Sequence, residues 1–163
     1  MTIPEIMQAI HADLADWVGE HKGTLSVAKD PWNVLELLTQ GPAGFLVVLH
    51  WAGDDALGEQ EQDPLAGNQI DVIVGYNLAL EPQPEVALFK PRGTRPALLA
   101  LVNDCRARVL SMVFPDDHET TRALGYGGAE AVTLPNGWPL AAYKFRVRLD
   151  AAVDVDDQRE VTP

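Results

Sequence analysis

An alternating run of apolar and polar residues near the middle of the chain constrains the fold more than any other feature. From Ile70 to Leu80 every second residue is apolar, so residues 68–80 form a strand with one apolar face if they are extended. A helix would need apolar residues at spacings of three and four instead. The run therefore predicts a long strand with one face against a core.

Two further runs have the length and bounds of strands. Residues 45–51 are almost continuously apolar and follow a Gly-Pro-Ala-Gly break, which predicts a strand covered on both faces. Residues 138–149 alternate apolar residues with Lys144, Arg146 and Arg148. A strand at residues 129–134 and the turn residues Pro-Asn-Gly precede this last run, so we expect a C-terminal hairpin with one apolar face and one basic face.

Apolar residues at helical spacing predict amphipathic helices at residues 3–18 and 96–114, with a shorter helical segment at residues 34–38. Thr2 is the expected N-cap of the first helix, and Pro115 should end the second. The order is helix, strand, loop, strand, helix and two strands. It favours an α+β fold with an antiparallel or mixed four-stranded sheet and helices packed on it, rather than alternating βαβ units. We expect one domain over residues 1–150.

Acidic residues give the 163-residue chain a net charge of −12, and most of this charge lies in two segments. The first is an expected long acidic loop at residues 52–67, and the second is an expected flexible acidic tail at residues 151–163. Nonspecific binding to nucleic acid needs clustered Lys and Arg, so we do not expect this acidic chain to bind nucleic acid. Neither a signal peptide nor a membrane-length apolar run is visible, so we expect a soluble protein of intracellular type.

Catalytic motifs are absent from the sequence. Cys105 is the only cysteine and lies in an apolar helical pattern, so we interpret it as a buried hydrophobic residue. Ser26 and Ser111 lack the context of a nucleophile. The Gly-rich residues 125–128 precede a strand, so we interpret them as a turn and not as a phosphate-binding loop. The sequence predicts no catalytic residue, cofactor site or metal site, and hence no enzyme.

The basic face of the last strand has two interpretations. Acidic residues across the sheet balance it in the first. In the second it binds the acidic loop or tail of a neighbouring copy, which would suit ring assembly. The candidate interface residues are Asp54, Asp55, Glu59, Glu61, Asp63, Lys144, Arg146 and Arg148.

Over residues 1–150 the order and texture of these elements resemble the tail terminator (tail completion) proteins and related minor tail proteins of long-tailed bacteriophages. The resemblance rests on the first helix, Asp30-Pro31-Trp32, the acidic segment before the long strand, the second helix, and the aromatic and basic last strand. It implies a ring, typically a hexamer, that caps the tail tube and meets the head connector proteins without a cofactor. The expected location is the head-proximal end of the virion tail, and the host cytoplasm before assembly.

Three alternatives remain open. The long loop and acidic tail depart from the family, and a head–tail connector or neck protein would share much of the pattern. An adaptor would bind a partner through the acidic segments. A small-molecule-binding domain would use polar candidates that we otherwise interpret as a strand boundary and a helix cap, namely His50, Asp116, Asp117, His118 and Glu119.

Overall fold

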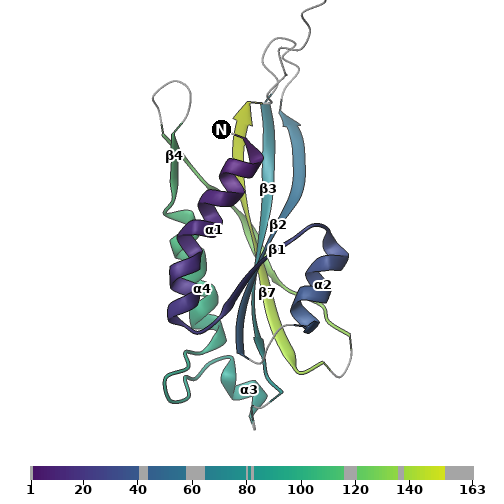
Figure 1. The fold of residues 1–163 in the computed structure, drawn as a ribbon, viewed down its shortest axis with the longest axis vertical. Coiled ribbons are helices and arrows are strands. Elements are labelled where there is room, and N and C mark those ends of the chain that lie inside the picture. The colour runs from purple at the N-terminus through teal and green to yellow at the C-terminus, as the bar shows by residue number, and fades with distance from the viewer. Residues whose placement is uncertain are drawn as a thin grey trace, which may run out of the picture.

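The computed structural model describes residues 2–40, 44–57, 65–79, 81, 83–115, 121–135 and 138–152. Its centre is a mixed five-stranded sheet of order β1-β2-β3-β7-β6 (Figure 1), which confirms the α+β fold with one strand more than the four expected. The strands of this sheet are β1 (Thr24–Ala28), β2 (Gly44–Leu57), β3 (Leu65–Asn77), β6 (Gly125–Ala131) and β7 (Leu140–Ala152).

Helices cover the two faces of the sheet unequally. In Figure 1, α1 and α4 lie side by side on one face, while α2 stands on the other face beside the lower half of the strands. A separate two-stranded sheet follows α4. The remaining elements are α1 (Ile3–Glu20), α2 (Pro31–Gln40), α3 (Pro84–Ala87), α4 (Leu98–Leu110), β4 (Val113–Pro115) and β5 (Thr121–Ala123).

The first helix begins where the sequence indicates. The backbone N–H of Thr2 donates to the Glu5 carboxylate at 2.6 Å, which fixes the first turn. Ile6, Ile10 and Leu14 then bury one stripe completely. The helix continues to Glu20, two residues beyond the expected end. Conversely α4 runs only from Leu98 to Leu110, inside the expected 96–114. The expectation that Pro115 ends it is wrong, because the helix stops before strand β4, to which Pro115 belongs.

The sequence did not reveal β1. This short strand pairs in parallel with β2, and α2 connects the two, so the fold contains one βαβ unit that the expected order did not include. β1 is an edge strand with little alternation, and Val27 is 51% exposed. Such a strand has too weak a hydrophobic pattern to be detected from sequence.

The expected loop at residues 52–67 is wrong for the part that the structure describes. Strand β2 continues to Leu57 and β3 begins at Leu65, and the two are paired to that end. Ladder hydrogen bonds join backbone groups, so acidic residues take part in them without an apolar pattern. Residues 58–64 lie outside the described part, as do residues 153–163 of the expected tail.

Two clusters of buried residues confirm that β2 is covered on both faces. The larger cluster lies under α1 and α4 and takes Phe45, Val47 and Leu49 from β2. The smaller cluster lies under α2 and takes Leu46 and Val48. The apolar faces of β3 and β7 contribute to the larger cluster, as their alternation predicts.

The C-terminal hairpin is confirmed by the antiparallel pairing of β6 with β7. Its first strand begins at Gly125, however, so the interpretation of residues 125–128 as a turn is wrong. His50 is not at a strand end either, because β2 runs seven residues further.

Candidate functional site

The register of the sheet places polar side chains from three strands in one row. His50 of β2 pairs with Asp71 of β3, which pairs with Arg146 of β7. All three point to the face that carries α2, called here the α2 face, because residues at even spacing along a strand share a face. Lys144 lies on this face two residues before Arg146 and opposite Glu130 of β6.

Asp71 is the centre of this cluster and is only 4% exposed. Arg146 holds its carboxylate with two hydrogen bonds, from Nε to Oδ1 at 2.7 Å and from Nη2 to Oδ2 at 3.0 Å. The Nη1 of Arg146 also donates to Gln69 at 2.8 Å. Two further basic side chains lie near Oδ2 of Asp71. Lys144 Nζ is 3.9 Å from this oxygen, and His50 Nδ1 is 4.0 Å from it, although His50 is charged only when protonated. The buried carboxylate is therefore compensated and fixes the Arg146 side chain.

Lys144 and Glu130 form a second, more open ion pair. Nζ of Lys144 lies 2.8 Å from Oε1 of Glu130, whose side chain is 67% exposed while that of Lys144 is 29% exposed. The hydrogen bond from Lys144 lowers the pKa of Glu130, so its carboxylate is ionised at neutral pH. An ion pair this exposed contributes little to stability and exchanges readily with solvent or solutes.

A glycine bulge lies next to these cations. Tyr126 pairs with Val147 and Ala129 with Phe145, so Gly127 and Gly128 together stand opposite Arg146. Gly128 has a φ of +97°, which favours glycine. A Cβ on Gly127 would lie 3.1 Å from Cγ of Arg146, so the absent side chain lets the arginine pass close to β6.

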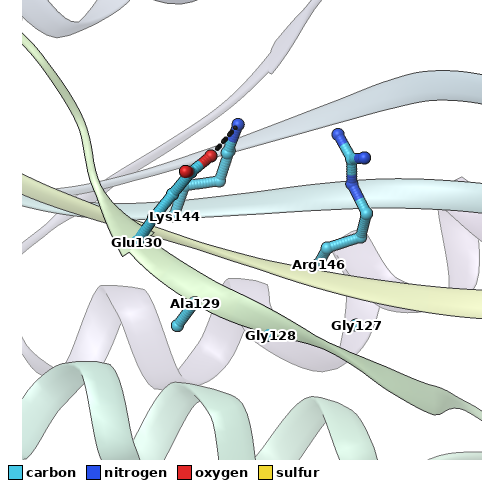
Figure 2. Close-up of a pocket in the computed structure, with 6 residues that line it drawn as sticks. All are labelled: Gly127, Gly128, Ala129, Glu130, Lys144 and Arg146. Carbon is cyan, nitrogen blue, oxygen red and sulfur yellow. Dashed lines mark ion pairs between the residues drawn. The ribbon is translucent and has the colours of Figure 1, made fainter.

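Two adjoining hollows open at the ion pairs. The larger, of about 400 Å³, lies between α2 and the end of β6, and the smaller, of about 220 Å³, lies at the glycine bulge. Both are lined by Glu130, Lys144 and Arg146, and together they are called here the α2 groove. Figure 2 shows Lys144 and Arg146 projecting from β7 to the same side, with Glu130 meeting Lys144. Apolar residues line the α2 end of the groove, namely Pro31, Val34, Leu35, Ile73 and Val132.

The predicted interface residues fall into three groups. Lys144 and Arg146 join the cluster just described, where acidic residues of the same chain meet them, as the balanced-face interpretation expects. Arg148 pairs with Asp150 at 2.8 Å, and their side chains are 40% and 54% exposed. The third group is the acidic segment, of which Asp54 and Asp55 lie on β2, while Glu59, Glu61 and Asp63 lie outside the described residues.

Register also separates Asp54 from the basic row. Asp54 pairs with Asn68, which pairs with Leu149, and these residues point to the α1 and α4 face. Arg148 pairs with Gln69 and points to the α2 face. Asp54 is exposed, so its charge and the charge of Arg148 lie on opposite sides of one sheet. They cannot meet within one molecule.

Of the small-molecule candidates, only His50 belongs to the groove. Asp116, Asp117, His118 and Glu119 lie outside the described residues. The sequence did not bring out Asp71 or Glu130 as partners. An acidic residue inside an apolar strand run was the available signal for Asp71, whereas Glu130 depends on the pairing of β6 with β7.

Other site types find little support in the described part of the chain. Those residues include no group of three or more His, Cys, Asp or Glu side chains placed to hold a metal ion. No helix among them is both long and apolar enough to cross a membrane. Cys105 is buried in the larger core, which confirms its interpretation as a hydrophobic residue.

No family model matches this sequence, and no curated protein matches it significantly.

Proposed function

We propose that this protein is a structural subunit that self-associates into a ring, of the type that terminates the tail of a long-tailed bacteriophage. The ring, a hexamer by analogy with that family, would cap the tail tube and present a docking surface to the head connector proteins. Its place would be the head-proximal end of the virion tail, reached from the host cytoplasm. It would need neither a cofactor nor catalysis.

The observation that carries this proposal is the separation of charge across the sheet. Asp54 lies on one face and Arg148 on the other, near the same end of the β2–β3–β7 platform. Contact between the two therefore requires a second molecule. Because they lie on opposite faces, a head-to-tail arrangement that joins one face to the other suits them better than a two-fold arrangement in which one surface meets itself. Head-to-tail contacts that close on themselves produce rings.

The energetics of the basic strand favour Arg148 over Arg146 as a contact. Arg146 is fixed by the buried Asp71, and moving it would leave a buried carboxylate without its partner. The pair of Arg148 with Asp150 is exposed on both sides, so replacing Asp150 with an acidic residue of a neighbour costs little. Gly67 beneath leaves room for the arginine, since a Cβ there would lie 2.7 Å from its Nε.

The test is the mass of the purified protein over a range of concentrations at low salt, by native mass spectrometry with negative-stain imaging. We expect a closed oligomer of one size. Arg148→Glu and Asp54→Lys should each weaken it, and the double variant should restore it because the swapped charges attract again. Lys90→Glu, an exposed reversal of the same sign away from the sheet, is the matched control.

A chain that stays monomeric at every concentration, and also when tail tubes are present, would contradict the ring. If Arg148→Glu leaves a closed oligomer intact, the chain does self-associate, but the proposed contact between Arg148 and Asp54 is wrong. A head–tail connector or neck subunit is the nearest alternative. It would assemble as well, but it would bind head connectors in preference to tail tubes in a co-sedimentation experiment.

A further inference from the structure

The α2 groove has a charge arrangement that the ring does not use. Its walls hold two permanent cations, Lys144 and Arg146, and two carboxylates, Asp71 and Glu130. These four charges sum to zero. The inner pair of Asp71 and Arg146 is fixed by hydrogen bonds, whereas the outer pair of Lys144 and Glu130 is exposed. The outer pair therefore offers one cation and one anion to a ligand at adjacent positions.

One end of the same groove is apolar. Val34 and Leu35 of α2 face Ile73 of β3 and Val132, which follows β6, beside the charged residues. Small-molecule sites are typically hollows of several hundred Å³ in which an apolar wall stands next to a few polar groups. The site thus has a place for an apolar group directly beside a place for two opposite charges.

We propose that the α2 groove binds a small zwitterion with an apolar side chain, of the α-amino acid class. The carboxylate of the ligand contacts Lys144 and its ammonium contacts Glu130, while its side chain lies against Leu35 and Val132. This inference goes beyond the proposed ring and does not depend on it.

Charge balance selects the zwitterion over a simple ion. A ligand with one charge can contact only one member of the exposed Lys144–Glu130 pair, and the other member then faces solvent. A zwitterion contacts both members, so it gains two charged hydrogen bonds in place of one. The net charge of −12 on the whole chain also repels free anions, whereas an electroneutral ligand is not affected.

The surroundings hold Arg146 in place next to the two binding groups. Hydrogen bonds to Asp71 and Gln69 fix Arg146, which lines the groove together with Lys144 and Glu130. At the bulge a Cβ on Gly128 would meet no atom within 4 Å, so the groove is open at this point of its lining. Asp71 and Arg146 are positioning residues in this arrangement, and Lys144 and Glu130 make the contacts.

A ligand series tests the proposal by saturation-transfer NMR on the full chain, a measurement that works for a monomer and for a ring. L-leucine is the probe. The same carbon skeleton without its ammonium, 4-methylpentanoate, and without its carboxylate, 3-methylbutylamine, should bind about tenfold more weakly or worse, because each loses a charged hydrogen bond. Glycine tests the apolar wall and should also bind more weakly than leucine.

Variants locate the binding. Lys144→Gln and Glu130→Gln should each reduce leucine affinity by about tenfold, since each removes one charged contact to the ligand. Lys90→Gln and Glu85→Gln, exposed residues outside the groove, are matched controls and should bind leucine as the parent chain does.

Three results would overturn the proposal. These are no saturation transfer to leucine, equal or stronger binding of 4-methylpentanoate, and leucine binding that both groove variants leave unchanged. None of these results depends on the mass of the assembly, so the ring proposal and the ligand-site proposal are tested independently.

Discussion

A buried carboxylate in the middle of a sheet is the residue with the largest electrostatic consequence. Asp71 faces solvent with only 4% of its surface, and Arg146 satisfies both of its oxygens. A buried pair of this kind adds little net stability, but losing one partner is costly because the remaining charge is desolvated and alone. Arg146 therefore stabilises the fold, whereas Arg148 does not have this role, although both occupy equivalent polar positions in the alternating sequence of β7.

Arg146→Met should therefore lower the free energy of unfolding by about 3 kcal/mol, whereas Arg148→Met should change it by less than about 1 kcal/mol. Urea denaturation of both variants measures the difference. Adding Asp71→Leu to Arg146→Met should recover most of the loss, because no buried charge then remains. Equal effects of the two single arginine variants would show that Asp71 does not depend on Arg146.

Cys105 offers a probe of the larger core. Burial raises the pKa of its thiol to about 12, so the reactive thiolate is scarce in the folded chain. We expect iodoacetamide to react slowly with the native protein and rapidly once urea unfolds it.

The same pKa shift predicts a pH dependence. An unfolded thiol loses its proton above a pKa of about 8.5, while the folded one keeps it to about 12. Its contribution to stability is thus complete below about pH 8.5 and falls as the pH rises toward 12. Cys105→Ala should lower stability overall but flatten this alkaline slope in urea titrations. A slope that is equal in both proteins would assign the effect to other groups.

At the scale of elements, the junction of α1 with β1 is tightly packed around one glycine. A Cβ on Gly23 would lie 2.5 Å from Cδ1 of Phe45 and 3.1 Å from its backbone oxygen. Because a backbone atom is among the neighbours, a rotamer change alone does not relieve the contact. The close approach of β2 to the end of α1 depends on this missing side chain.

Gly23→Ala should accordingly destabilise the fold by about 1–3 kcal/mol through overpacking. Gly19→Ala is the control, since a Cβ there meets nothing within 4 Å and alanine favours the helix that Gly19 belongs to. Thermal unfolding followed by circular dichroism should lower the Tm of the first variant and keep or raise that of the second. The opposite order would refute this account of the junction.

At the scale of the whole molecule, helices α1 and α4 bury most of one face of the sheet, and α2 buries a smaller part of the other. The three long strands β2, β3 and β7 run together to one end, where most of the described side chains are charged or polar and α2 does not reach (Figure 1). This end and the open edges at β1 and β6 are the surfaces available for assembly in the described part of the chain.

Assembly through opposite charges should respond to salt. The Debye length falls from about 30 Å at 0.01 M to about 8 Å at 0.15 M, so the proposed contact between Asp54 and Arg148 should weaken as salt is added. We expect the oligomer fraction, measured by sedimentation velocity, to fall with rising ionic strength. A fraction that rises instead would mean that the net charge of −12 opposes association and that apolar contacts drive it.

The sequence by itself determined the elements with strong periodicity. The α1 stripe, the alternation of β3 and β7 and the two-faced burial of β2 all follow from apolar spacing, because the period of a helix or strand is a property of the local backbone. The α+β class follows from their order. The burial of Cys105 also follows from apolar spacing, since the residue lies in the apolar stripe of its helix.

Only the tertiary structure decided what depends on pairing between distant segments. Strand β1 and the outer half of the paired strands β2 and β3 are held by backbone hydrogen bonds. These bonds form whatever the side chains are, so they leave no apolar pattern in the sequence. The groove arises in the same way, since Asp71, Glu130 and Arg146 meet only through the register of three strands. Register is set by the packing of the whole sheet, and a shift of one residue would move each of these charges to the opposite face.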